Sequence, residues 1–136
     1  MSNPSMEASI RASDLDAVLT LLPKIDSLSP QQFVSFTPDQ DPVFHPIIEE
    51  LQLGLYRHGF IRAFDWRSWQ SEAQRLFDDP TQLDTADAIT CLKLLTLHVR
   101  KDRFCGGHFA AMLQAGHVGA ILHRLQGLRR ENRSTG

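Results

Sequence analysis

Apolar residues recur along the chain at the spacing of amphipathic helices. Between residues 14 and 22 they fall at i, i+3, i+4 and i+7, which places them on one face of a helix. Ser13 is the expected N-cap of this helix, and Pro23 is expected to break or kink it. The apolar positions are Leu15, Val18, Leu19 and Leu22.

Two more helices are expected before residue 60. The stretch SPQQF predicts a short helix, because Ser29 and Gln32 form a capping box around Pro30 at the first helical position. This capping box favours a helix over a strand across QQFVSFTP. The following segment, TPDQDPVFHP, is typical of a polar loop punctuated by proline. Pro46 then opens a helix that Gly59 is placed to stop.

The segment GFIRAFDWRSWQSEAQRLFDDP carries the clearest local signals in the chain. Asp65 is expected to cap a helix that begins at Trp66. Phe64 precedes the cap and can pack on Trp69, which forms a hydrophobic staple. Pro80 ends the segment.

The longest apolar run, LDTADAITCLKLLTLHVRKDRF, predicts a central helix. Its apolar residues cover more than half of the helical surface, as in a helix surrounded by others. Asp84 is the expected N-cap, so the helix is placed near residues 84–102. Two helices are expected after it, from about 107 to 115 and from 117 to 125 or beyond.

These elements predict an all-α fold, a compact bundle of about six or seven short helices around the central helix. No segment alternates apolar and polar residues for long enough to predict a strand. The 136 residues are enough for one domain. We place this single helical domain at residues 1–128 and a flexible basic tail at residues 129–136.

Two segments taken together resemble a family of small bacterial proteins known only as a domain of unknown function. They are GFIRAFDWRSWQSEA and ADAITCLKLLTLHVRKDRFCGGHF, with GAILHRL after them, and they cover residues 55–125. The family is marked by an FDW–W segment and a KLLT–R–DRF–G segment. The resemblance implies a shared fold and no particular reaction. The matching residues are Phe64, Asp65, Trp66, Trp69, Ala86, Asp87, Lys93, Leu94, Leu95, Thr96, Arg100, Asp102, Arg103, Phe104 and Gly107.

Charge is unevenly distributed although the net charge is only −2. Residues 1–98 hold seven Lys and Arg against fourteen Asp and Glu, whereas residues 99–136 hold seven against two. This polarity favours self-association or an anionic partner for the C-terminal part, and it is equally typical of basic residues at helix C-termini. The acidic first part argues against nucleic acid as a partner.

Other features of the composition point to a cytoplasmic protein. No apolar run approaches the length that spans a bilayer, and the first residues lack the pattern of a secretory signal. Two cysteines are too few for a disulfide framework in a chain of this size. We therefore expect no membrane partner.

The stretch VRKDRFCGGH, at residues 99–108, is the first candidate site. Arg100 and Arg103 share a helix face, and Gly106 and Gly107 lie where a new helix exposes its first amides. These four residues are the expected anion-binding corner. The alternative is an ordinary helix end, in which Asp102 pairs with an arginine, Gly106 caps the helix and Phe104 enters the core.

Three weaker sites follow from residue types. Cys105 and His108 could act as nucleophile and base, because a helix N-terminus and nearby arginines favour a thiolate. An aromatic pocket or interface is expected at Tyr56, Asp65, Trp66 and Trp69, unless the tryptophans only fill the core. Zinc would need Cys91, His98, Cys105 and His108, whose spacing lacks the two close pairs of structural sites, so we expect no metal and no cofactor. The other histidines, His45, His58, His117 and His123, are expected near helix ends or on the surface.

The sequence therefore favours a small helical protein of the cytoplasm that acts through protein–protein contacts and self-association, as a homo-oligomer or with another protein. The alternative is an enzyme or small-molecule binding protein that uses the corner at residues 100–108 for a small anionic ligand. The sequence contains no phosphate-binding P-loop, no GxGxxG dinucleotide motif, no HExxH zinc motif and no GxSxG nucleophile motif. It therefore leaves open whether the protein is an enzyme.

Overall fold

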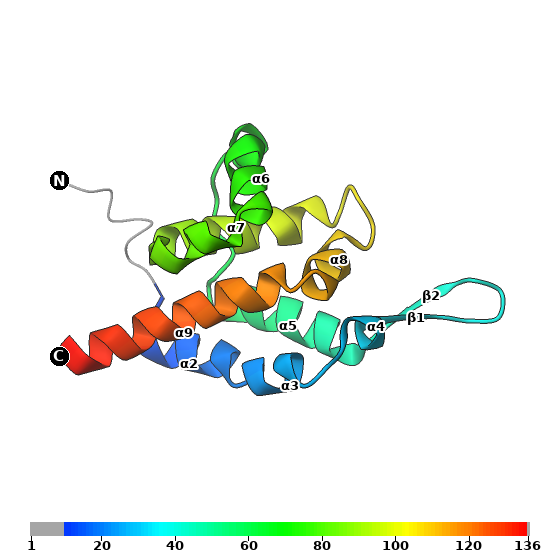
Figure 1. Cartoon of the computed structure of the whole chain (residues 1–136), viewed down its shortest axis with the longest axis horizontal. Coiled ribbons are helices and arrows are strands. Elements are labelled where there is room, and N and C mark those ends of the chain that lie inside the picture. Colours follow the sequence, from blue (N-terminus) through cyan, green and yellow to red (C-terminus); the bar gives the residue numbers. More distant parts are fainter. Residues whose placement is uncertain (1–9, 136) are drawn as a thin grey trace.

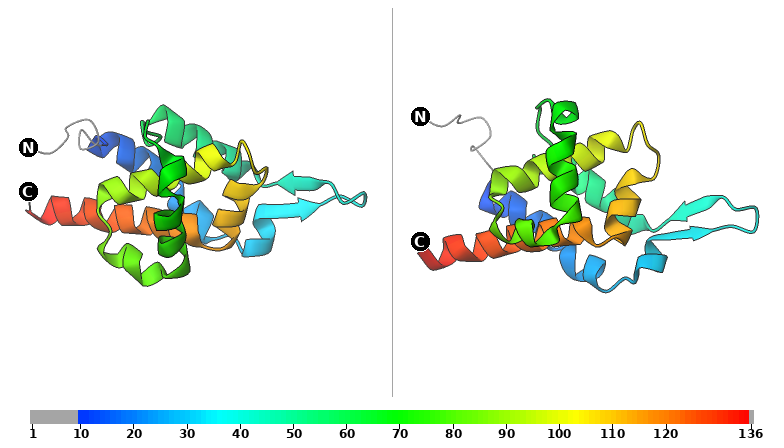
Figure 2. Two further views of the ribbon diagram at one scale, coloured as in Figure 1. Left: turned by 90° about the horizontal axis from the view of Figure 1, so that it is seen from above. Right: turned by 45° about the horizontal axis from the view of Figure 1, so that its top comes forward.

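Helix α7 (Ala88–Lys101) is the centre of the fold in this computed structural model, which describes the backbone of residues 10–135 and the side chains of residues 10–131. From Cys91 to Val99 every residue except Lys93 is buried. The helix contacts α8 (His108–Gln114) and α9 (His117–Thr135), and α6 (Gln70–Asp78) crosses it (Figure 2). The predicted all-α bundle with a central helix is confirmed.

The first helical segment is split into two helices, α2 (Ala12–Leu19) and α3 (Leu22–Asp26). The expected cap at Ser13 is wrong, because α2 begins at Ala12 and its N-cap is Arg11, two residues before Ser13. Pro23 lies in the first turn of α3 and so begins a new helix, where its missing N–H is harmless. The expected apolar face is buried at Val18, Leu19 and Leu22.

The short helix α4 (Pro30–Phe33) and its capping box at Ser29 and Gln32 are confirmed. The expectation that no strand follows is wrong. Strands β1 (Val34–Phe36) and β2 (Pro42–Phe44) form an antiparallel hairpin in which Val34 lies opposite Phe44 and Phe36 opposite Pro42. The hairpin projects from the helical body at the end opposite to the C-terminal end of α9 (Figure 1).

Helix α5 (Pro46–Arg57) and its end are as expected, with Gly59 at a φ of 77° that favours glycine. The cap at Asp65 is also confirmed, since its side chain accepts a hydrogen bond from the Ser68 N–H at 3.4 Å. This cap starts a 3-10 turn, η1 (Trp66–Trp69), which continues into α6. The staple is present as an edge-to-face contact between Phe64 and Trp69, with ring centroids 6.0 Å apart.

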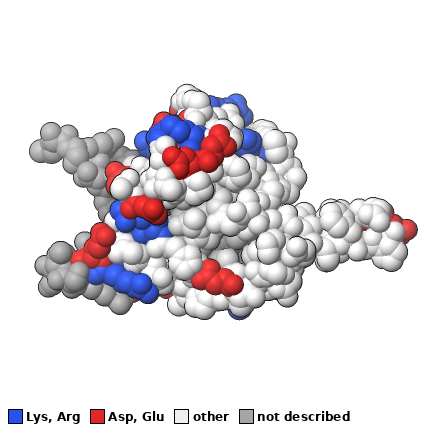
Figure 3. All heavy atoms as spheres, viewed as in Figure 1, with Lys and Arg blue, Asp and Glu red and all other residues white. Residues whose placement is uncertain are grey.

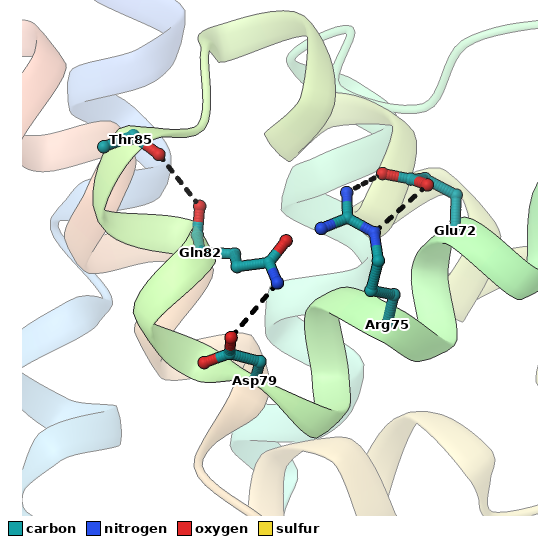
Figure 4. A network of polar contacts seen from close by, with 5 residues as sticks. All are labelled: Glu72, Arg75, Asp79, Gln82 and Thr85. Atoms are coloured by element: carbon teal, nitrogen blue, oxygen red, sulfur yellow. Dashed lines mark hydrogen bonds and ion pairs between the residues drawn. The ribbon is translucent and has the colours of Figure 1, made fainter.

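The segment before α7 corrects the predicted start of the central helix. Residues from Pro80 to Thr85 form a separate 3-10 helix, η2, and Asp84 is an exposed residue within it. The side chain of Asp79 closes the junction between α6 and η2 by accepting hydrogen bonds from the Thr81 hydroxyl and from the Gln82 amide (Figure 4). Beside it, on α6, Arg75 pairs with Glu72. The cap of α7 is Asp87, whose carboxylate accepts from the Thr90 N–H at 2.8 Å.

Replacing Asp87 with alanine should therefore destabilise the protein by about 1 kcal/mol, the usual cost of losing an N-cap side chain. Bonding to Thr90 also lowers the pKa of the Asp87 carboxyl, which shows that the charged form is the one bound. The matched control is Asp84→Ala, which should change the free energy of unfolding by less than about 0.5 kcal/mol. Urea denaturation followed by circular dichroism measures both. Equal losses in the two variants would contradict this start of α7.

Helix α9 continues through residues 129–135, the segment that the sequence predicts as a tail. Arg129 on this segment pairs with Asp16 of α2, with Nε and Oδ1 3.1 Å apart. Among residues 10–135, no helix combines the length and the apolar character that crossing a bilayer requires.

Candidate functional site

The residues of the expected anion site lie at the corner between α7 and α8. Arg100 and Arg103, the two cations of this site, do not line the same groove. Arg103 donates from Nη2 to the Tyr56 hydroxyl at 3.3 Å. It lines a groove along α5 that does not include Arg100. Gly107, at a φ of 85°, is the residue that turns the chain into α8. The anion-binding set Arg100, Arg103, Gly106 and Gly107 stays a prediction.

Asp102 and Phe104 differ from the alternative that the sequence offered for this corner. Instead of pairing with an arginine, Asp102 accepts a hydrogen bond from the Phe109 N–H at 2.9 Å. Its carboxylate therefore lies at the N-terminal end of α8, where a negative charge is favourable. Phe104 does not enter the core, because 66% of its surface is exposed. Phe109, fully buried, takes the core position.

The expected aromatic site is divided into separate groups. Trp66 lies beside Phe104 with ring centroids 6.1 Å apart, and the Arg67 guanidinium lies over both rings. Trp69 contacts Phe64, and the Lys93 ammonium lies 5.8 Å from the Trp69 ring. Tyr56 is on α5 with Arg103. Both tryptophans are half-buried, and only Trp66 contacts a residue of the corner, Phe104.

Three histidines that the sequence analysis did not group together meet where α7, α8 and α9 converge. His98 Nδ1 lies 3.0 Å from His108 Nε2, at hydrogen-bond distance. The His117 ring packs edge-to-face against His98 with centroids 5.0 Å apart, and it makes a second edge-to-face contact with Phe77 of α6 at 5.1 Å. His117 was expected near a helix end or on the surface, and it is the first residue of α9, yet it is buried.

Burial leaves two nitrogen atoms of this histidine cluster without hydrogen-bond partners and lowers the pKa of all three rings. The Nε2 atoms of both His98 and His117 are inaccessible and have no hydrogen-bond partner. Burial, helped by the neighbouring histidines, lowers the pKa of His98 to about 2, and it lowers that of His117 to about 4. Burial also lowers the pKa of His108, with the nearby Lys101 ammonium acting in the same direction. All three rings are therefore neutral at pH 7.

A pocket of about 120 Å³ opens beside this cluster, between α6, α7 and α8, and we name it the α6–α7 pocket. Part of its wall is apolar and part carries nitrogen groups. The lining residues are Gln70, Ala73, Gln74, Phe77, Leu97, His98, Lys101, His108 and Met112. A sequence signal for it existed: His98 interrupts the apolar surface of a helix that is otherwise buried on nearly every side.

Of the residues considered for nucleophilic or metal chemistry, His98 and His108 share a site in the described structure, and Cys91 and Cys105 do not line it. The His108 ring faces His98, and His108 meets Cys105 through a backbone hydrogen bond to the Cys105 carbonyl oxygen. Cys105 is exposed, whereas burial raises the pKa of the Cys91 thiol to about 12. Within residues 10–131, no three His, Cys, Asp or Glu side chains have the arrangement of a metal site. The pair Cys105 and His108 stays a prediction.

The β1–β2 hairpin is the second feature that the sequence did not predict. Because side chains alternate along a strand, the cross-strand pairs Val34–Phe44 and Phe36–Pro42 lie on one face, which is entirely apolar. Phe36 is 63% exposed and Phe44 is 44% exposed. Figure 3 shows the hairpin as an arm without basic atoms, whose acidic atoms are confined to its tip.

A groove runs from the base of the hairpin along α5, and we name it the α5 groove. Its first part, of about 390 Å³, lies between Phe44, Ile48 and Ala110. Its second part, of about 300 Å³, lies between Leu53, Tyr56 and Arg103. The two parts share Glu49, Gln52 and Asp102.

Comparison with known proteins identifies the family of the chain but assigns it no reaction. Searches of curated proteins and of solved structures each found no match. A family model described as a family of unknown function, DUF6508, matches residues 10–131, which covers every helix described above up to the last turn of α9. This match confirms the expected membership of a family of unknown function. The chain therefore belongs to DUF6508.

Proposed function

We propose that the protein acts through protein–protein contact and self-associates through the β1–β2 hairpin. The observation that carries this proposal is the unpartnered apolar face of a projecting two-stranded sheet. Both of its strands are edges, and neither carries the lysine that commonly protects an exposed edge. Large exposed apolar surfaces of this kind are typical of interaction sites.

The hairpin and the α5 groove are complementary surfaces for a contact between two copies of the chain. The hairpin is an apolar arm that ends in Asp39 and Asp41, and the α5 groove begins on apolar residues and ends at the exposed cation Arg103. Glu49 and Asp102 stand on the rim between these ends. Around a twofold axis, each hairpin enters the groove of the other copy, so every contact forms twice.

Light scattering across a concentration series tests this proposal, with a dimer of twice the 15.4 kDa chain mass as the expected species. Phe36→Ser should weaken the dimer at least tenfold, because burying a phenylalanine ring contributes about 2 kcal/mol and the ring is buried once in each copy. The matched control is Phe104→Ser, since Phe104 is as exposed as Phe36 but lines neither part of the groove. A monomer at every concentration, or equal effects of the two substitutions, contradicts the proposal.

A further inference from the structure

The α6–α7 pocket combines an apolar wall with a wall of nitrogen groups. Phe77 of α6 and Met112 of α8 belong to the apolar wall. Lys101 at the end of α7 and His108 at the start of α8 belong to the polar wall. This division is typical of sites that hold a small molecule with one polar end and one hydrocarbon end.

The charge of the pocket is positive. Lys101 is the one charged residue among those that line it, and no carboxylate lines it. Two carboxylates stand next to lining residues, and each already accepts a hydrogen bond: Asp78 from the Gln74 amide and Asp102 from the Phe109 N–H. A group that enters the pocket therefore meets the Lys101 ammonium and the His108 ring, and the ammonium favours an oxyanion.

His98 is a buried residue that holds the polar wall of the pocket in place. It is 4% exposed, it lines the pocket, and its Nδ1 lies 3.0 Å from His108 Nε2 and so fixes the orientation of the His108 ring. Its own Nε2 has no partner, although an unpaired buried polar atom costs about 1–3 kcal/mol. Thr96, the other buried polar residue of α7, has hydrogen-bond partners for its hydroxyl, so His98 alone on this helix keeps an unpaired buried nitrogen where leucine would pack without that cost.

We propose that the α6–α7 pocket binds a short-chain carboxylate, whose oxygens contact Lys101 and His108 and whose hydrocarbon end lies against Phe77 and Met112. By the same measure of volume a water molecule needs roughly 10–15 Å³. The pocket of about 120 Å³ therefore has room for an acid of a few carbon atoms. This binding site is separate from the hairpin and does not rest on the proposed self-association.

Titration with butyrate, followed by NMR of the histidine rings and methionine methyl groups, tests this proposal. We expect saturable shifts at His108 and Met112 with a dissociation constant in the millimolar range. Butyramide, which has the same shape without the charge, should bind at least tenfold more weakly. Inorganic phosphate, which has charge without a hydrocarbon end, should also bind more weakly.

The variant Lys101→Gln should weaken butyrate binding about tenfold, and the matched control Lys24→Gln, an exposed lysine paired with Glu50 on α5, should leave it unchanged. Far-UV circular dichroism checks that both variants fold as the parent does. Shifts that grow linearly without saturation, equal binding of butyramide, or unchanged binding by Lys101→Gln would each overturn the proposal. Phosphate binding as tight as that of butyrate would also overturn it, and so would shifts in a parallel amide spectrum that are confined to Gly106 and Gly107 at the corner.

Discussion

Lowering the pH from 7 to 4 should destabilise the folded protein by at least about 3 kcal/mol, because His98 and His117 resist protonation where they are buried. An unfolded chain takes up a proton on each of these rings near the ordinary histidine pKa of 6.5. In the folded protein the pKa values fall to about 2 for His98 and about 4 for His117. Because the unfolded chain binds more protons, lowering the pH reduces the free energy of unfolding.

The pH window follows from the direction of these shifts. Above pH 6.5 the rings are neutral in both states and contribute no pH dependence. Below it the unfolded state binds more protons, so stability falls with pH, by about 1.4 kcal/mol for each unit of pKa difference. For His117 this fall is complete near pH 4, whereas for His98 it continues towards pH 2. The lowered carboxyl pKa values of Glu72, Asp79 and Asp87 begin to cost stability only as the pH approaches their ordinary values of 4.5 and 3.8, so they add to the loss at the acid end of this window and not between pH 7 and 6.

Urea denaturation at pH 7.5, 6, 5 and 4, followed by circular dichroism, measures this dependence. His117→Phe keeps a ring between Phe77 and His98 but removes a titrating group, so its stability should fall less steeply with acidification. The control His123→Gln replaces an exposed histidine that is bonded to Asp26 on α3 and leaves the buried cluster intact, so it should retain the parent slope. A free energy of unfolding that is constant between pH 7 and 5 would refute the role of the cluster.

The sequence predicted the helical elements where periodicity and caps agree. The staple of Phe64 and Trp69, the capping box at Ser29 and the stop at Gly59 are all local, so their signals lie within a few residues. The burial of α7 was predictable for a different reason. A helix with apolar residues on nearly all sides has no face suited to solvent.

The errors arose where two local signals compete or where long-range contacts decide. Asp84 and Asp87 both precede the same apolar run, and only the η2 turn distinguishes them. The hairpin has strands of three residues each, too short for an alternating pattern, and its Thr37 to Asp41 turn contains no glycine. Gln40 adopts the positive φ of 68° there instead.

The candidate sites were harder to predict than the fold because they join residues that are distant in sequence. His98, His108 and His117 come from three helices, and no spacing rule relates them. The α6–α7 pocket adds residues of α6 that carry no motif of their own. Two of the residues that line this pocket, Lys101 and His108, lie inside the stretch 99–108 that the sequence analysis gives as the first candidate site.

Phe109→Ala should destabilise the protein by about 3–5 kcal/mol, the usual cost of removing a buried phenylalanine ring. Phe109 has no exposed surface and packs in the core at the start of α8, directly after His108. Because a domain of this size has a total stability of about 5–15 kcal/mol, this one substitution should leave it close to unfolding. The midpoint of urea denaturation at pH 7.5 measures the loss.

Phe104→Ala is the matched control, because it removes the same ring five positions earlier in the same corner. Its ring is 66% exposed and contacts only the half-buried Trp66 and the Arg67 guanidinium among the described aromatic and cation contacts. The expected loss is less than about 1 kcal/mol. The ordinary helix end, one of the two alternatives that the sequence left open, places Phe104 in the core, so the pair of variants decides which phenylalanine is buried at the corner. A larger loss for Phe104→Ala than for Phe109→Ala would mean that the corner faces the other way, with His108 and the α6–α7 pocket displaced along with it.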